Sequence, residues 1–317
     1  MSEFVAKFDS VIPHDMYTLP IAEQRRLYRA LPEVFPYPRP AGVTSVDLAV
    51  RAPGRVIPVR CYSPAGRAKP GVLCYARGDG FCLGDLETHD TVAAELAAKT
   101  GYLTVFVDVR SAPEHKFPAA VHDLRAAIEA VSSQPATYGA TDGPIGLVGD
   151  SSGGNLVVAN CLLARDRGGP ALACHGLVSP VLDFSRWAAD GGHDAPILSA
   201  GEMAFYAGCY VEHVEDLLDP LISPLRSAEL HDLPPATILA TELDSLRDDA
   251  VDYARKLIAA GTRVQLTVEP GLVHAPLRAR GMCAAAARAW DEFCGSVATL
   301  MDRAQRAVAT PAATGRR

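Results

Sequence analysis

The chain has 317 residues, 49% of them hydrophobic and 21% charged, with a formal net charge of −7. This composition supplies enough apolar side chains for a sizeable core and excludes a disordered role. The acidic balance, with no basic stripe, gives no electrostatic support for binding nucleic acid or an anionic membrane surface. We therefore expect neither nucleic acid nor a membrane among its partners.

The N-terminus and the cysteines indicate the compartment. The opening residues MSEFVAKFDSVIPHD carry charges where a signal peptide needs an apolar stretch. Apolar runs elsewhere end before the roughly 18 residues that a membrane span requires. The eight cysteines form no C-x-x-C pair, and several lie inside apolar runs, which favours buried reduced thiols over a disulfide framework or a zinc site. We predict a cytoplasmic protein.

The N-terminal part of the chain differs in character from the rest. Residues 1–43 are polar and rich in proline, with a helical patch at 21–31, and are expected to form a cap segment over another surface. Two strands are expected at 44–52 and 55–63, separated by the turn residues Pro53-Gly54. Short, nearly continuous apolar runs at 71–76 and 102–109 are typical of strands buried on both faces.

From there, strand and helix patterns alternate. The expected helices lie at 89–101, 117–133, 154–169, 249–260 and about 279–304, and the further strands at 144–149, 173–182, 234–242 and 262–270. Such alternation predicts a mostly parallel sheet with helices on both faces. The irregular stretch at about 183–225 is expected to be a cap insertion in a domain spanning 44–305, and 306–317 a disordered tail.

The strongest local motif is Gly149-Asp150-Ser151-Ser152-Gly153-Gly154, a G-x-S-x-G pattern between an expected strand and an expected helix. A sharp turn in this place strains the serine and exposes its hydroxyl in the cleft, and the glycines allow strand and helix to approach closely. A glycine-rich turn that binds phosphate, or only reverses the chain, is the alternative. The context favours Ser151 as a nucleophile.

A serine nucleophile needs a base and an acid that orients the base. His274 follows the last expected strand in a loop, which favours it over the other histidines as the base. Asp244 follows the preceding strand directly and is the preferred acid, with Glu242 as the fallback. Asp248 and Asp249 are expected instead at the N-terminus of the next helix, where acidic side chains stabilise the helix dipole.

These motifs carry a family resemblance. GDSSGGNL resembles the GDSAGGNL signature of the hormone-sensitive-lipase group of α/β-hydrolases, which includes bacterial acetyl-esterase-like enzymes. VRSAPEHKFPAAVHDLRAAI, LVSPVLDF and LDSLRDDA resemble further blocks of that group, and GDGFCLGDLETHD resembles the stretch downstream of its H-G-G-G motif, so the likeness spans roughly 44–300. The resemblance implies an α/β-hydrolase fold with a helical cap and a triad of Ser151, Asp244 and His274, with no metal or organic cofactor.

The chain departs from that group at the oxyanion hole. Where the group has H-G-G-G-F, this chain reads Arg77-Gly78-Asp79-Gly80-Phe81. By resemblance, the backbone N–H groups of Asp79, Gly80 and Ser152 form the hole, where donors meet the charge of the transition state. We expect the Asp79 carboxylate to turn away and pair with Arg77. A weakened or specialised hole is the alternative.

The predicted activity is hydrolysis of a carboxylic ester with a short acyl group or a small hydrophobic body. Aromatic residues expected to line the substrate pocket are Phe81, Trp187, Phe205 and Tyr206. The last three fall in the cap insertion and suit a cap core equally well. One rival activity is that of a pathway-specific deacetylase, amidase, lactonase or acyltransferase. A second rival is a non-catalytic ligand-binding protein on the same fold. The sequence names neither the physiological substrate nor the oligomeric state, so a homodimer stays open.

Overall fold

The computed structural model describes residues 1–187 and 194–309. Its centre is an eight-stranded sheet in the order β1-β2-β4-β3-β5-β6-β7-β8. The strands are β1 (Thr44–Ala52), β2 (Arg55–Ser63), β3 (Lys69–Ala76), β4 (Tyr102–Val107), β5 (Ile145–Asp150), β6 (Leu172–Val178), β7 (Ala236–Leu243) and β8 (Val264–Val273). β2 runs antiparallel to β1 and to β4, and all other pairs are parallel. The mostly parallel sheet that the alternation predicted is confirmed.

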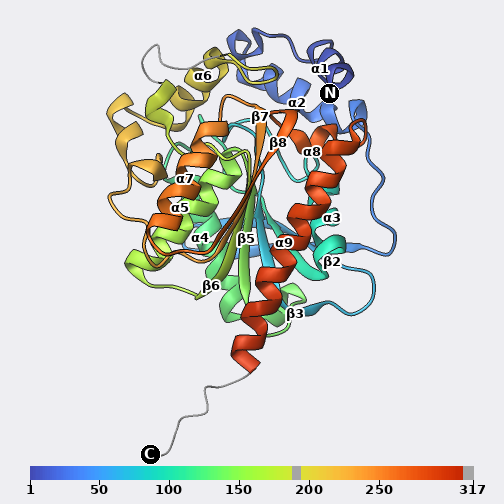
Figure 1. The fold of residues 1–317 in the computed structure, drawn as a ribbon, viewed down its shortest axis with the longest axis vertical. Coiled ribbons are helices and arrows are strands. Elements are labelled where there is room, and N and C mark those ends of the chain that lie inside the picture. Colours follow the sequence, from blue (N-terminus) through green and yellow to red (C-terminus); the bar gives the residue numbers. More distant parts are fainter. Residues whose placement is uncertain (188–193, 310–317) are drawn as a thin grey trace, which may run out of the picture.

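Helices cover both faces of this sheet (Figure 1). α3 (Asp90–Thr100) and α9 (Ala284–Ala309) pack together on one face, while α4 (Ala119–Ser133), α5 (Ser152–Arg167) and α7 (Arg247–Ala259) cover the other. Every residue of β4 is buried, as are the first twelve of α5. Two-sided burial explains why these strands are continuous apolar runs rather than alternating ones.

Further helices gather at the end of the sheet where the parallel strands finish. They are α1 (Ser2–Asp9) and α2 (Ile21–Val34) from the N-terminal segment, α6 (Ala200–Tyr210) from the 183–225 segment, and the short α8 (Pro276–Ala279). Gly201 of α6 lies against the ring of Tyr17. The two segments expected to form a cap therefore meet there, although residues 188–193 lie outside the described residues and the proposed cap boundaries stay a prediction.

Three predicted element boundaries need correction. No pattern in the sequence indicated α1, whose Phe4 packs on Phe35 with ring centroids 4.9 Å apart. The C-terminal helix predicted at about 279–304 is α9, which begins at Ala284, and the separate short α8 comes before it. The tail predicted as disordered from 306 is helical through Ala309, because strong helix formers continue the pattern of α9. Residues 310–317 lie outside the described residues.

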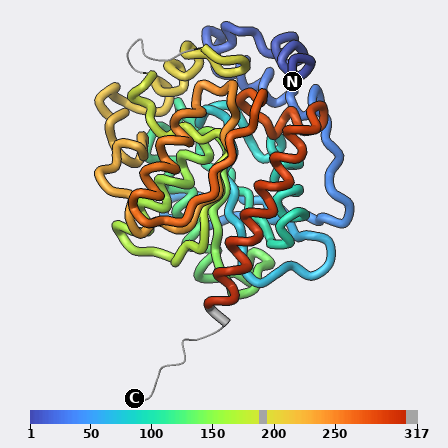
Figure 2. The backbone as a smooth tube through the Cα atoms, viewed as in Figure 1, coloured from blue at the N-terminus to red at the C-terminus, as the bar shows by residue number. Residues whose placement is uncertain are grey.

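The tube view shows α1 and the end of α9 at opposite ends of the molecule (Figure 2).

All eight cysteines are free, and six of them are buried. None of the helices within residues 1–187 and 194–309 is long and apolar enough to cross a membrane.

Candidate active site

Ser151 lies at the junction of β5 and α5 with φ +48° and ψ −118°, a conformation that is strained for any residue except glycine. Its backbone N–H donates to the carbonyl of Val178 at 2.9 Å, and its carbonyl accepts the N–H of Asn155 at 3.2 Å. These bonds hold the turn that the G-x-S-x-G motif predicted. The structure thus places Ser151 on a strained turn at the C-terminal edge of the sheet.

The glycines of this motif are needed for close approach. A Cβ atom on Gly153 would lie under 3.0 Å from the carbonyl oxygen of Ala76, and one on Gly149 would lie equally close to the carbonyl oxygen of Gly153. Contacts this short do not occur for real Cβ atoms, so a side chain at either position would push the strand and helix apart. The absence of side chains at Gly149 and Gly153 therefore allows the start of α5 to pack directly against the neighbouring strands beside Ser151.

Asp244 and His274 meet at the ends of β7 and β8. Nδ1 of His274 lies 2.9 Å from Oδ2 of Asp244, and both residues are buried. The Asp244 carboxylate also accepts the N–H of Leu246 and the hydroxyl of Thr241. With its Oδ2 at this nitrogen, Asp244 holds the Nδ1 proton of His274 and leaves Nε2 as the basic nitrogen.

Their charges shift both pKa values. Burial works to lower the pKa of His274, but the charge and hydrogen bond of Asp244 outweigh it, and the pKa is raised above its ordinary value of 6.5. Burial works to raise the pKa of Asp244, and here the His274 imidazolium and the hydrogen bonds prevail, so this pKa is lowered. The pair is therefore built to carry an imidazolium beside a carboxylate.

The other acids considered from the sequence lie elsewhere. Glu242 accepts the backbone N–H of Gly271, and Asp248 is an exposed partner of Arg247. Asp249 is buried in α7, where its carboxylate accepts the N–H groups of the 182–183 loop. Burial raises the pKa of Asp249 to about 7. Of these acids, only the preferred Asp244 contacts His274 within the described residues.

The predicted oxyanion donors do not all have the same surroundings. The backbone N–H of Asp79 donates to Oγ of Ser152 at 3.0 Å, and that of Phe81 approaches the same oxygen at 3.3 Å. Within the described residues the N–H groups of Gly80 and Ser152 have no acceptor. Two of the three predicted donors, the Gly80 and Ser152 amides, are thus available. The third, the Asp79 amide, is occupied by the hydroxyl of Ser152, where the family signature has alanine.

The Asp79 carboxylate is held mainly by Arg77, although its Oδ1 also accepts the Ser152 hydroxyl at 3.4 Å. Its Oδ2 lies 2.6 Å from Nε of Arg77, and it also accepts the N–H of Gly84 at 2.9 Å. Arg77 in turn contacts Asp108 at 2.8 Å, and the side chains of Arg77 and Asp79 are almost fully buried. The predicted pairing of Asp79 with Arg77 is confirmed, and it keeps the negative charge of Asp79 neutralised.

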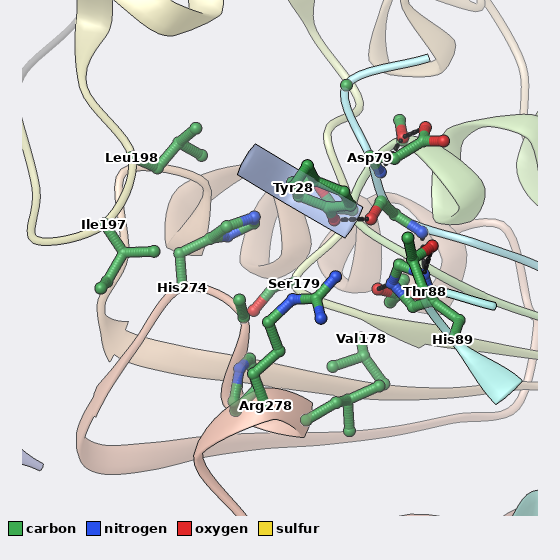
Figure 3. A pocket seen from close by; sticks show the side chains of 18 of the residues that line it. Tyr28, Asp79, Thr88, His89, Val178, Ser179, Ile197, Leu198, His274 and Arg278 are labelled. Atoms are coloured by element: carbon green, nitrogen blue, oxygen red, sulfur yellow. Dashed lines mark hydrogen bonds and ion pairs between the residues drawn. The ribbon is translucent and has the colours of Figure 1, made fainter. Parts of the chain in front are cut away.

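A cavity of about 220 Å³ joins these groups. Ser151, Ser152, Asp79, Gly80 and His274 all line it. Its volume lies below the roughly 300–1,000 Å³ of sites for drug-sized ligands. Apolar side chains from distant parts of the chain complete the wall, among them Phe8, Ile12, Met16, Val178, Ile197, Leu198 and Met203. Figure 3 shows how the imidazole of His274 projects between Leu198 and Tyr28.

The predicted pocket aromatics divide into two pairs. Phe81 and Tyr206 line the cavity, and the Phe81 ring stacks on Tyr210 at 3.7 Å between centroids. Trp187 and Phe205 are not among the lining residues, which corrects their assignment to the pocket. Trp187 is buried, and Phe205 packs edge-on against Tyr206 on α6. Adjacent positions on a helix point in different directions, and of these two only Tyr206 lines the cavity.

Sequence reasoning missed several polar residues of the cavity, among them Tyr28, His89, Asp150 and Arg278. Asp150 accepts the hydroxyl of Tyr75 at 2.6 Å, and burial raises its pKa to about 6. His89 is buried, and burial together with nearby arginines lowers its pKa well below 6.5. Position 150 belongs to the motif itself and could have been singled out. Tyr28 and His89 come from segments that only the tertiary fold brings to the site.

The N-terminal segment is tied to this wall. Arg25 of α2 donates to both carboxylate oxygens of Glu114 and to the carbonyls of Cys82 and Ala112. Tyr28, one turn later, donates its hydroxyl to the carbonyl of Gly78 at 2.7 Å. These bonds place α2 against the loop that carries the predicted oxyanion donors.

Within residues 1–187 and 194–309, no group of three or more His, Cys, Asp or Glu side chains could hold a metal ion.

Comparison with known proteins agrees with this geometry. A family model described as an alpha/beta hydrolase fold matches residues 73–278. The carboxylesterase NlhH of Mycobacterium tuberculosis is 40% identical over 225 residues, which cover 69% of this chain and 70% of NlhH. The esterase LipI of the same organism is 37% identical over 251 residues, or 77% of this chain and 78% of LipI.

A solved structure is similar over nearly the whole chain. The esterase of Pyrobaculum calidifontis superimposes with a TM-score of 0.81 at 31% identity, covering 90% of this chain and 94% of that one. Ser151, Asp244 and His274 all lie within the region that the family model matches. The chain belongs to the α/β-hydrolase family, in its hormone-sensitive-lipase group.

Proposed function

We propose that the protein hydrolyses carboxylic esters of small acids, with Ser151 as the nucleophile, His274 as the general base and acid, and Asp244 as the orienting acid. The observation that carries the proposal is the 2.9 Å contact between His274 and Asp244 at the cavity that Ser151 also lines. The esterase names of the relatives support the same bond type. The modest cavity volume supports a small substrate.

The reaction proceeds through an acyl-enzyme. Oγ of Ser151 attacks the acyl carbon while Nε2 of His274 takes the hydroxyl proton, and the carbonyl oxygen becomes an oxyanion. The N–H groups of Gly80 and Ser152 donate to that oxyanion. As the tetrahedral intermediate collapses, the bond from the acyl carbon to the alcohol oxygen breaks and His274 protonates the alcohol. Water then repeats the sequence on the acyl-enzyme and releases the acid.

Active-site labelling tests the assignment. A fluorophosphonate probe is expected to form a covalent adduct on Ser151, and the Ser151→Ala variant to lose both the adduct and turnover of p-nitrophenyl acetate. Ser185→Ala is the matched control, because Ser185 lies away from the cavity and is expected to leave labelling intact. An intact, folded protein with no adduct on Ser151 would overturn the proposal in favour of a ligand-binding protein.

Substrate panels test the acyl size and the bond. p-Nitrophenyl acetate and butyrate are expected to be turned over faster than the octanoate, because the cavity is short of room for a long chain. Matching anilides are expected to react far more slowly than the esters. Faster turnover of the amides, or of the octanoate, would contradict the assigned substrate class.

A further inference from the structure

Among the described residues, Arg278 is the one arginine of the cavity wall without an ion-pair partner. It lies on α8, four residues after His274. Its Nη2 atom is buried and has no hydrogen-bond partner. A buried, unsatisfied donor on a charged group is costly. A buried guanidinium without a hydrogen-bond acceptor inside a pocket indicates that a bound ligand supplies the acceptor.

The other arginines of this region are paired. Arg280, which also lines the cavity, contacts Glu95 and donates to the hydroxyl of Thr91. Arg77, behind the oxyanion loop, contacts Asp79 and Asp108. The fold thus supplies acids for two of three neighbouring guanidinium groups and leaves Arg278 without one.

Tyr28 holds the Arg278 side chain in place. The guanidinium carbon lies 4.7 Å from the centroid of the Tyr28 ring, and the Tyr28 hydroxyl is anchored on the carbonyl of Gly78. Stacking of this kind uses one face of the guanidinium plane and leaves its edge free for hydrogen bonds. Arg278 is therefore pre-oriented toward a ligand rather than free to swing, which reduces the entropy lost on binding.

Within the described residues none of the other titratable groups on the cavity wall forms an ion pair with Arg278, although the charge of Arg278 opposes the rise in the pKa of Asp150. Oδ1 of Asp150 accepts the Tyr75 hydroxyl and the Gly78 N–H, and its Oδ2 lies 3.7 Å from Nε2 of His89. The Glu202 carboxylate accepts the N–H and hydroxyl of Ser199. His89 is neutral at physiological pH because burial and the arginines lower its pKa. These groups therefore leave the edge of the Arg278 guanidinium open to a ligand.

Part of the apolar wall lies across the base from Arg278, whereas Val178 lies on the same side as Arg278. In Figure 3, Ile197 and Leu198 lie on one side of His274, and Arg278, Thr88 and His89 lie on the other. An ester bound with its carbonyl near His274 therefore meets apolar side chains in one direction and a guanidinium in the other. A neutral, wholly apolar ester would leave Arg278 unpaired.

We infer that Arg278 binds a carboxylate of the substrate, so that the preferred substrates are esters that carry one carboxylate beside the scissile bond. This inference rests on the proposed esterase function and narrows its substrate class. A carboxylate fits because its two oxygens match the paired N–H groups on the edge of a guanidinium. The carboxylate belongs either to the acyl part of the ester, as in a dicarboxylic acid half-ester, or to its alcohol part.

Matched pairs of charged and neutral esters distinguish the two sources. For the acyl part, p-nitrophenyl hydrogen glutarate is compared with its methyl ester. For the alcohol part, 4-acetoxybenzoate is compared with methyl 4-acetoxybenzoate. The wild-type protein is expected to show a kcat/KM at least about tenfold higher for the charged member of one pair, the size of a charge-assisted hydrogen bond.

Variants assign that preference to the guanidinium. Arg278→Met is expected to bring the charged-to-neutral ratio of kcat/KM down to about one or below, and Arg278→Lys to retain part of it. The matched control is Arg288→Met on α9, whose side chain is 59% exposed and does not line the cavity. This control is expected to keep the wild-type ratio. A ratio in Arg278→Met equal to that of the wild type overturns the inference.

Two readouts separate failure of the inference from failure of the proposed function. A wild-type protein that is labelled on Ser151 and hydrolyses both members of each pair equally well is an esterase without the carboxylate site. A wild-type protein that is neither labelled on Ser151 nor active overturns both the carboxylate site and the proposed esterase function. If Arg278→Met does not fold, inhibition of the wild type decides the matter: stronger inhibition by glutarate than by glutaramide supports the site, and equal inhibition overturns it.

Discussion

The Ser152 hydroxyl oxygen lies 3.0 Å from the backbone nitrogen of Asp79 and accepts a hydrogen bond from that N–H group. Both residues depart from the pattern of the family, which has alanine and glycine at these places. The two departures are therefore coupled in space: the extra hydroxyl occupies the Asp79 amide, which the family resemblance predicts as an oxyanion donor. Each such donor contributes on the order of 2.7–4 kcal/mol to transition-state stabilisation.

Removing that hydroxyl tests the coupling. In Ser152→Ala the Asp79 amide loses its internal acceptor and becomes available to the oxyanion, so kcat for p-nitrophenyl acetate is expected to rise about a hundredfold. Ser223→Ala is the matched control, because Ser223 is also buried and accepts a backbone N–H, that of Phe184. Unchanged or lower turnover in Ser152→Ala would show that the hydroxyl does not compete with substrate.

Asp79 itself is expected to matter for stability. Asp79→Asn removes the charge that lies 2.6 Å from Arg77, whose side chain is 2% exposed. Leaving a buried guanidinium with only part of its countercharge costs about 3 kcal/mol, which lowers the Tm by several degrees. Thermal unfolding of Asp47→Asn gives the comparison, since Asp47 is 63% exposed and its ion pair with Arg60 contributes little. Equal Tm values for the two variants would contradict this view.

Gly80 is expected to be intolerant of a side chain. It has φ +64°, and a Cβ there would lie 2.6 Å from the Tyr206 ring, so Gly80→Ala must strain the loop or move Tyr206. Because the Gly80 amide is a proposed oxyanion donor, kcat is expected to fall about a hundredfold. Gly208→Ala on α6 is the control: it meets no atom within 4 Å and is expected to leave kinetics unchanged. Similar kcat values for both alanine variants would contradict the role of this amide.

The pH profile should report the contact between His274 and Asp244. His274 must be neutral to accept a proton, and its raised pKa keeps it protonated to higher pH. The kcat/KM is therefore expected to fall as the pH drops through a midpoint above 6.5. In Asp244→Asn burial acts without the countercharge, so the midpoint moves to lower pH and kcat falls by about 10³–10⁴. Asp248→Asn, an exposed position in the first turn of α7, is expected to keep the wild-type profile.

Much of the fold and the contact of Asp244 with His274 were predictable because the information is local. Gly149 and Gly153 flank a serine between an apolar strand and a helix, and that order of residues specifies a sharp turn by sterics alone. Asp244 and His274 each follow a strand directly. Since parallel strands end at one edge of the sheet, residues after β7 and β8 must lie near each other.

Features that the sequence did not reveal depend on contacts between distant segments. Tyr28 reaches Gly78 across fifty residues, and no pattern around it predicts this. Trp187 was assigned to the pocket because it is aromatic and lies in the cap insertion, but the hydrophobic effect buries such a ring equally well in the core. The Asp79 amide donates to the Ser152 hydroxyl only because of the rotamer that the Ser152 side chain adopts, and a sequence motif does not specify a rotamer.

The placement of α1 and of the end of α9 at opposite ends of the molecule has a practical consequence (Figure 1). Phe8 and Ile12, close to the first residue, form part of the cavity wall, whereas α9 leads the chain away from it. Attachment to a resin, sensor surface or fusion protein is therefore better made through the carboxyl end. A bulky tag on the amino end would sit beside the cavity and change the very kinetics it was meant to help measure.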